Sequence, residues 1–218
     1  MRGFSLAAAL LAAATLVLPA VSAAQPAPST VTGIPLDAPW KTAVYALAKR
    51  TFVHPAWGWQ HSERNYNLAT MLAKDDGIAI DSDVLFAACF LHDMAAFEPY
   101  ASRHKGMEHG DAAAIESEAV LRNAGFPMAK FARVQAAERG HMHDADSLDF
   151  LGAVGAARML SLTGANSPSF AGAVKSLRGF VTAIPPKLLT KTGARIGKER
   201  AQELRAFLDG LQAEDPPG

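Results

Sequence analysis

The chain has 218 residues, 50% of them hydrophobic and 19% charged, with 21 basic and 21 acidic side chains. This composition is globular, which excludes a disordered, collagen-like or coiled-coil chain. A neutral chain without a basic cluster offers no electrostatic basis for binding a nucleic acid polymer or a membrane surface. The single cysteine, Cys89, excludes an internal disulfide, so stability must come from packing, with or without a metal ion.

The first 23 residues have the pattern of a secretory signal peptide. Arg2 gives a positive start, residues 6–18 are an almost unbroken Ala/Leu/Val run, and Ala23 closes a cleavage site of small residues. The run is too short to cross a bilayer comfortably, and a retained membrane anchor is the alternative. We therefore expect a secreted or periplasmic protein, cleaved near Ala23 and without membrane contact afterwards.

Residues 24–36, rich in Pro, Ser, Thr and Ala, predict a flexible lead-in, and residues 37–215 predict one domain. No stretch alternates polar and β-branched residues, so the sequence predicts an all-α bundle of about seven to eight helices. In chain order, we expect helices that begin at Asp37, cover 60–74, run from the Asp81 cap through His92, cover 108–123, begin at Pro127, cover 146–162, begin at Pro168, and cover 197–211.

All seven histidines lie within residues 54–143. Two of them, His61 and His92, lie on predicted helix faces that are otherwise apolar. The carboxylates of Asp93 and Asp146 also fall beside core faces, which is costly unless they are paired or bound to a cation. One divalent cation could be held by all four residues, through two imidazole nitrogens and two carboxylate oxygens. The alternative is that each histidine is a hydrogen-bonded core residue.

The order of these residues resembles a known family. His61 is followed 31 positions later by the pair His92-Asp93, and Asp93 is followed 53 positions later by Asp146. The flanking segments agree: they read HSERNYNLA, DVLFAACFLHDM and HDADSLDFLGAVGAAR. Over about residues 40–214 the chain resembles the HD superfamily of metal-dependent phosphohydrolases. The resemblance implies a single HD domain, with His61, His92, Asp93 and Asp146 as ligands of one divalent ion.

The resemblance also implies a mechanism, in which a bound ion activates water and polarises a phosphoryl oxygen. Asp93 is expected to bind the ion and to orient the water. Lys105 and Arg64 are the candidates for the cation that offsets phosphate charge, with Arg158 a weaker one. The expected substrate is a small molecule with a phosphoester, such as a nucleotide. Mixed nitrogen and oxygen ligands suit Mn, Fe, Co, Ni or Zn, so the identity of the ion stays open.

The segment before Asp146 departs from the family. Many relatives have a separate histidine and an intervening loop there, whereas GHMHDAD places His141 and His143 directly upstream. His104 and His109, in RHKGMEHGD, resemble a segment of some two-metal members. A second ion is therefore an alternative to a single one.

Two other acidic residues of this segment are expected to act without touching the ion. Asp144 is a candidate for a helix cap or a hydrogen-bond acceptor behind the ligands, and Asp149 for fixing a neighbouring helix. Glu63, close to His61 on the same predicted helix, is a candidate for either the site or the solvated helix surface.

Other functions remain open at this point. Relatives with this fold also hydrate cyanamide or carry out di-iron oxygenation, and the oxygenation would need two ions. A non-catalytic reading is a secreted helical protein whose metal is structural, with four ligands and no open position for water. The number of bound ions and the presence of a substrate cavity would separate these alternatives.

Overall fold

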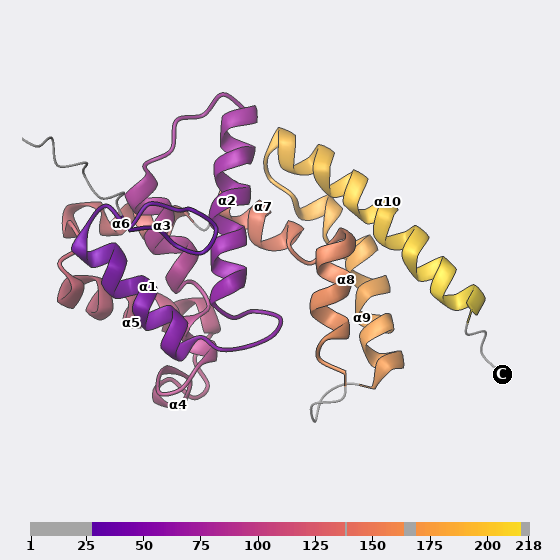
Figure 1. Cartoon of the computed structure of the whole chain (residues 1–218), viewed down its shortest axis with the longest axis horizontal. Coiled ribbons are helices and arrows are strands. Elements are labelled where there is room, and N and C mark those ends of the chain that lie inside the picture. Colours follow the sequence, from indigo (N-terminus) through magenta and orange to yellow (C-terminus); the bar gives the residue numbers. More distant parts are fainter. Residues whose placement is uncertain (1–27, 138, 164–168, 215–218) are drawn as a thin grey trace, which may run out of the picture.

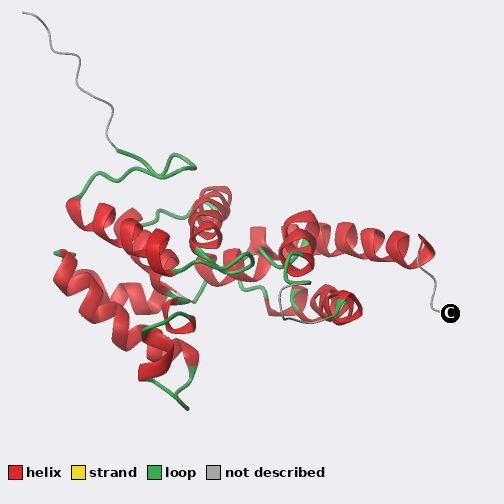
Figure 2. Cartoon of the chain, turned by 60° about the horizontal axis from the view of Figure 1, so that its bottom comes forward, coloured by secondary structure: helices red, strands yellow, loops and turns green. Residues whose placement is uncertain are grey.

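The computed structural model describes residues 28–137, 139–163 and 169–214. The described part is all helical, as predicted, apart from an isolated bridge between Ser29 and Pro35, and Figure 2 shows helices joined by loops without a strand. The expected signal peptide, residues 1–23, lies outside the described residues. None of the described helices combines the length and apolar character needed to span a membrane.

The described part contains ten α-helices, more than the seven to eight expected, because the short helix Tyr100–Arg103 and the break within residues 146–162 were not foreseen. They are α1 Pro39–Thr51, α2 Trp59–Asp75, α3 Ser82–Leu91, α4 Tyr100–Arg103, α5 His109–Ala124, α6 Phe131–Ala137, α7 His141–Leu148, α8 Gly152–Leu160, α9 Phe170–Ala183 and α10 Lys191–Glu214. Short 3-10 turns cover Met94–Ala96, Met128–Lys130 and Pro185–Lys187.

The helices form two groups with α2 and α7 between them (Figure 1). Helices α1, α3, α5 and α6 pack together on one side, and α8, α9 and α10 pack together on the other. Helix α2 contacts α3 in the first group, α10 in the second, and α7. The α2–α7 pair therefore joins the two groups, and any side chain that bridges these helices lies at the centre of the fold.

Several helix boundaries follow from local chemistry that the sequence shows. Pro39 occupies the first turn of α1, where its missing N–H costs nothing. The Asp81 carboxylate caps α3 by accepting hydrogen bonds from the backbone N–H groups of Asp83 and Val84. Helix α5 ends at Gly125, whose φ of 85° is left-handed. The Asp81 cap is confirmed, whereas the first helix begins at Pro39 rather than at Asp37, the helix expected from Pro127 begins at Phe131, and the last helix begins at Lys191 rather than at residue 197.

One predicted helix is wrong. The stretch 146–162 is not continuous, because α7 ends at Leu148 and α8 begins only at Gly152. Gly152 has a φ of 67°, which interrupts right-handed helix. At Gly155 an added Cβ would lie 2.2 Å from the backbone of Phe150, so this turn also requires close backbone approach. Asp146 therefore lies in the middle of an earlier helix, and its face does not continue into α8.

The lead-in also differs from its prediction where it is described. Residues 28–36 pack on the domain, with Ile34 and Leu36 buried in the main core. Glu63 bonds to this segment directly. One of its carboxylate oxygens accepts a hydrogen bond from the hydroxyl of Tyr45 at 2.7 Å, and the other accepts one from the backbone N–H of Thr32 at 3.2 Å. Glu63 is consequently buried rather than solvated, and it binds the chain's own N-terminal segment.

Candidate metal centre

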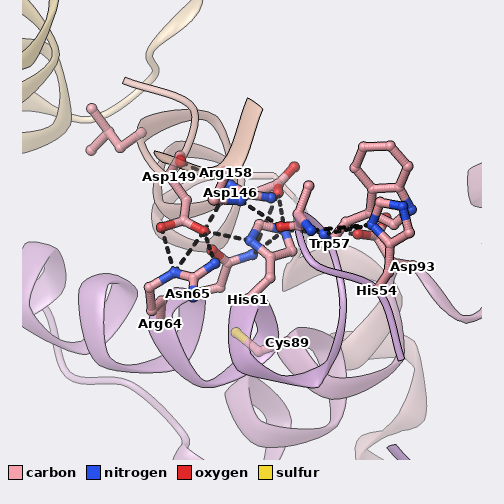
Figure 3. Close-up of polar contacts among 12 residues, drawn as sticks. His54, Trp57, His61, Arg64, Asn65, Cys89, Asp93, Asp146, Asp149 and Arg158 are labelled. Carbon is pink, nitrogen blue, oxygen red and sulfur yellow. Dashed lines mark hydrogen bonds and ion pairs between the residues drawn. The ribbon is translucent and has the colours of Figure 1, made fainter. Parts of the chain in front are cut away.

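His61 lies in the first turn of α2, and its two ring nitrogens face different partners. Nδ1 lies 2.6 Å from the carboxylate Oδ2 of Asp149, and Nε2 lies 2.9 Å from Oδ1 of Asp146 (Figure 3). An Nδ1–H donated to the short Asp149 contact leaves the lone pair on Nε2. Gly58 makes this placement possible, because a Cβ there would lie 2.5 Å from the carbonyl oxygen of His54 in the preceding turn.

His92 follows the last residue of α3 and so lies at the end of that helix rather than within it. Its Nδ1 donates to the carbonyl oxygen of Cys89 at 3.0 Å, which again places the lone pair on Nε2. That Nε2 atom is buried and makes no hydrogen bond with any described residue. A buried polar atom without a hydrogen bond is uncommon in folded proteins, and an ion or a water molecule bound to Nε2 would satisfy it.

The structure brings the four predicted ligands to one point. Nε2 of His92 lies 3.2 Å from Oδ2 of Asp93 and 3.7 Å from Oδ1 of Asp146, and Nε2 of His61 lies 3.7 Å from Oδ2 of Asp93. Donor atoms of His61, His92 and Asp146 all lie within 4.8 Å of one another. They come from α2, the end of α3 and α7, so the centre joins three elements far apart in sequence.

The electrostatics of this point favour positive charge. Burial alone would lower the pKa of His92, but the carboxylates of Asp93 and Asp146 outweigh it and raise that pKa well above its ordinary value. Burial would likewise raise the pKa of Asp146, yet its contacts with His61 and His92 bring the net pKa below the ordinary value. The two shifts arise from the mutual attraction of buried imidazoles and carboxylates, which favours the charged form of each group.

The donor set fits a divalent cation. Two imidazole lone pairs and two carboxylates face one another at distances of 2.9–3.7 Å, and with neutral imidazoles all of them are acceptors that repel. A cation among them would turn this repulsion into coordination. Nitrogen and oxygen donors in this ratio suit Mn, Fe, Co, Ni or Zn, and the geometry does not choose among these.

Asp149 contacts His61 on the ring side opposite to the predicted metal site, and the nitrogen atoms of three side chains lie close to its carboxylate. Besides His61, it accepts from Nε of Arg64 at 2.9 Å, and Nη1 of Arg158 lies 2.8 Å from its Oδ2. Burial would raise the pKa of Asp149, but His61 and Arg64 hold it below its ordinary value. Asp149 thus does more than fix a helix: it keeps the imidazole of His61 in one tautomer and orientation.

The two cations predicted to meet a phosphate lie elsewhere. Arg64 is bound to Asp149 by Nε and Nη2 and is 33% exposed, so it faces the back of His61. Lys105 lies in the exposed turn after α4, and its side chain has no ion pair or hydrogen bond within the described part of the chain. The four predicted ligands are brought together, whereas Arg64 contacts Asp149 instead of the point where they meet.

Three of the other histidines pair with carboxylates outside this centre. His104 lies 2.8 Å from Glu116, His141 3.1 Å from Asp76, and His143 3.0 Å from Asp144. The side chain of His109 is not described. Among the described residues, only one group could hold an ion through three or more donors, and His104, His141 and His143 do not belong to it.

Asp144 has the role expected of it. Its carboxylate is fully buried and accepts hydrogen bonds from the backbone N–H groups of Leu189 and Thr190 and from the Thr190 hydroxyl. It therefore fixes the start of α10 against α7.

Asn65 is a residue whose role the sequence did not reveal. It is fully buried, one turn after His61, and its Nδ2 donates to Nε2 of His61 at 3.2 Å and Oδ1 of Asp146 at 3.4 Å. Its Oδ1 is buried without a hydrogen bond among the described residues. The signal was available in its spacing, since a polar amide at i+4 on an apolar face needs partners.

A cavity of about 280 Å³ borders the centre on the side of His92. Helices α3, α5 and α6 form its walls, largely with small residues such as Ala88 and Ala114. Its polar lining includes Ser117, Asp111 and Arg139. The volume of the cavity is at the lower end of the range for small-molecule sites. Because His92 lines it, a small ligand in the cavity would reach one of the predicted metal ligands.

Residues 58–171, more than half of the chain, match the HD domain family. This match contains all four converging residues. The chain belongs to the HD domain family. The resemblance noted from the spacing of His61, His92-Asp93 and Asp146 is therefore confirmed, and the paired histidines and carboxylates lie in the HD domain itself. No protein of curated function matches the chain.

Solved structures agree with the HD fold. YpgQ of Bacillus subtilis, crystallised with ADP, is 20% identical, with a TM-score of 0.59 over 82% of this chain and 94% of its own. A predicted HD superfamily hydrolase from an uncultured Thermotogales bacterium is 22% identical, with a TM-score of 0.55 over 80% and 90% of the two chains. An HD-superfamily hydrolase from Bacillus thuringiensis is 18% identical, with a TM-score of 0.55 over 82% and 96%.

Proposed function

We propose that this HD-domain protein is a metal-dependent phosphohydrolase that cleaves a phosphoester of a nucleotide or another small molecule. The observation that carries the proposal is the convergence of His61, His92, Asp93 and Asp146 on one point beside a cavity of small-molecule size. Membership of the HD family supports a hydrolase. That one similar fold was crystallised with ADP makes nucleotides a reasonable first substrate class to test.

The four residues would hold one divalent ion, which when bound supplies a water of lowered pKa and polarises a phosphoryl oxygen. The two imidazoles are the buried side of the centre, with His61 1% and His92 9% exposed at the side chain, whereas Asp93 is 26% exposed. The cavity adjoins the centre at His92, whereas water reaches it from the more exposed carboxylate side. There Asp93 can accept a hydrogen bond from the attacking water and orient its lone pair toward phosphorus.

Arg139 is the cation that lines the cavity together with His92. Its guanidinium has no ion pair among the described residues, and its side chain is exposed, so it can contact a phosphate or another anionic group without leaving a partner. We assign to Arg139 the charge-offsetting role for which Arg64 is poorly placed. Lys105 keeps that role as a second candidate.

The cavity also bears on the alternatives. A purely structural ion needs four closed ligands and no adjoining space, whereas this centre borders a cavity. Di-iron oxygenation needs a second set of ligands, and His104, His141 and His143 are paired with other carboxylates. Both observations favour single-ion hydrolysis. With a signal peptide over residues 1–23, we further propose a secreted or periplasmic enzyme that meets small phosphoesters outside the cytoplasm.

Metal analysis of the purified protein, followed by a panel of phosphoesters, tests the proposal. We expect at least one ion per chain and metal-dependent phosphate release. Asp93→Ala should lower kcat by at least about 100-fold, while Asp75→Ala, an exposed aspartate at the end of α2, should leave it unchanged. Arg139→Ala should raise KM more than it lowers kcat.

Two outcomes would contradict the proposal. A metal-loaded protein inactive on every phosphomonoester, phosphodiester and nucleoside triphosphate would redirect the assignment to other HD chemistry. Equal turnover by Asp93→Ala and wild type would remove Asp93 from the mechanism.

A further inference from the structure

Arg158, on α8, is one of the most deeply buried charged residues of the described chain, with a side chain 4% exposed. It reaches back from the C-terminal group of helices to the centre of the fold (Figure 3). Its Nε donates to the carbonyl oxygen of Ala56, and its Nη1 donates to the backbone carbonyl of Asp149 at 2.8 Å. Its guanidinium also lies 4.2 Å from the ring centroid of Phe150.

These contacts hold α8 to two other segments of the backbone at once. Ala56 lies in the tight turn before α2, three residues before that helix begins. Asp149 and Phe150 form the break between α7 and α8. Because α8 packs with α9 and α10, one guanidinium ties the C-terminal group to the start of the helix that carries His61.

The same guanidinium acts on the carboxylate that orients His61. Nη1 of Arg158 lies 2.8 Å from Oδ2 of Asp149, and this is the oxygen that contacts Nδ1 of His61 at 2.6 Å. Arg64 already neutralises Asp149, and it does so from a half-exposed position that costs little desolvation. A second, buried guanidinium on one carboxylate is therefore more than charge balance requires.

A further observation separates Arg158 from an ordinary core ion pair. Its third nitrogen, Nη2, is buried and makes no hydrogen bond with the described residues. Leaving a charged donor unsatisfied is expensive. A lysine could supply the charge without this cost but could not contact Ala56 and Asp149 in fixed directions, because only guanidinium is planar and forked. The planar, forked shape of the Arg158 guanidinium therefore matters more to the site than its positive charge.

We propose that Arg158 is a positioning residue of the metal centre, which sets the orientation of His61 through Asp149 and couples ion binding to the position of α8 relative to the turn before α2. The proposal rests on the metal centre of the proposed function and is independent of the substrate. It predicts that losing the shape of Arg158 weakens ion binding even when its positive charge is kept.

The test is a double-mutant cycle read by Mn²⁺ affinity, which requires no substrate. Arg158→Lys should lower the affinity of the full protein by about 10-fold or more, in the range measured for groups behind metal ligands. Asp149→Asn should lower it by a similar or larger factor. In the Asp149→Asn background, Arg158→Lys should have little further effect, because Arg158 acts through Asp149.

Arg64→Lys is the matched control, since it changes the other guanidinium on the same carboxylate. Its expected effect on Mn²⁺ affinity is less than about threefold, because the Arg64 side chain is partly exposed to solvent. Co²⁺ provides a second readout, because the absorption bands of the bound ion report its ligand geometry. We expect altered bands for Arg158→Lys and wild-type bands for Arg64→Lys.

Four results would overturn the proposal. They are wild-type Mn²⁺ affinity in folded Arg158→Lys, equal losses in Arg158→Lys and Arg64→Lys, and additive losses in the cycle. The fourth concerns folding. If Arg158→Lys does not fold, Arg158→Gln replaces it, and failure of both to fold at saturating Mn²⁺ would make Arg158 a core residue only. A protein that passes these tests but hydrolyses no phosphoester would refute the proposed function and leave this proposal standing.

Discussion

His61 and Asp149 lie 88 positions apart, yet Nδ1 of the histidine is 2.6 Å from Oδ2 of the aspartate, with both side chains almost completely buried. An imidazole held in this way presents its other nitrogen as a lone pair in a fixed direction. Substitution of Asp149 and removal of the ion both test this arrangement.

Asp149→Asn keeps the shape of the side chain and removes its charge. We expect Mn²⁺ affinity to fall by about 10- to 100-fold, because the amide is a weaker acceptor for the His61 N–H and can stabilise the wrong tautomer. Calorimetric titration of the metal-free protein measures it. Asp209→Asn, on the exposed face of α10, is the control, and a loss as large there would show that the effect is not specific.

Removing the ion should destabilise the folded protein. The centre concentrates two carboxylates and two imidazole lone pairs, and an ion that binds only the folded state stabilises it by about 2.7 kcal/mol at a concentration 100 times its Kd. Thermal unfolding with excess Mn²⁺ and with EDTA should therefore give clearly different Tm values. In His92→Ala the difference should shrink strongly, and a full wild-type difference would place the ion elsewhere.

Filling the cavity should discriminate between substrates by size. Ala114→Leu adds bulk to the wall beside His92, so we expect KM for a nucleotide to rise by about 10-fold or more while KM for inorganic pyrophosphate changes little. Steady-state kinetics on both substrates measure the contrast. Ala119→Leu, an exposed position on the same helix, is the matched control. Equal effects on both substrates would mean that the cavity does not hold the leaving group.

Acid should destabilise the α1–α3 contact at Asp83. This carboxylate lies 2.8 Å from the Lys130 ammonium and 2.9 Å from that of buried Lys41, and the hydrogen bond from Lys130 is the main cause that lowers the pKa of Asp83 below 3.8. Because the folded pKa is the lower one, the stabilisation is complete above about pH 4 and is lost as pH falls through the folded pKa.

Asp83→Asn should therefore lower the free energy of unfolding by about 1 kcal/mol at pH 7, and the difference from wild type should vanish toward pH 2. Urea unfolding across this range measures it, with Asp75→Asn as the control. A difference that stays constant with pH would contradict the assignment.

The sequence predicted the all-α class and the four converging residues, for a physical reason. Polar groups on apolar helix faces must find partners, which singled out these residues, and the resemblance of their order to the HD family favoured one shared ion over separate core histidines. The caps of α3 and α5 were equally local and equally predictable.

The rest depended on contacts that local patterns do not contain. The break before α8 arises from the left-handed conformation of Gly152, and nothing in a run of Gly and Ala distinguishes that glycine from its neighbours. Arg64 was considered for the phosphate because of its charge, but its partner Asp149 comes from a helix 85 positions away. The burial of Glu63 likewise depends on a segment that composition alone made look unstructured.

Cys89 gives this centre a built-in reporter. It is the one cysteine of the chain, it is fully buried, and burial raises the pKa of its thiol well above its ordinary value, while its carbonyl oxygen holds the ring of His92. An alkylating reagent can reach the sulfur only when α3 opens at this end. The rate of alkylation therefore reports how often the end of α3 next to His92 opens. A bound ion should lower this rate, and the measurement needs no engineered label.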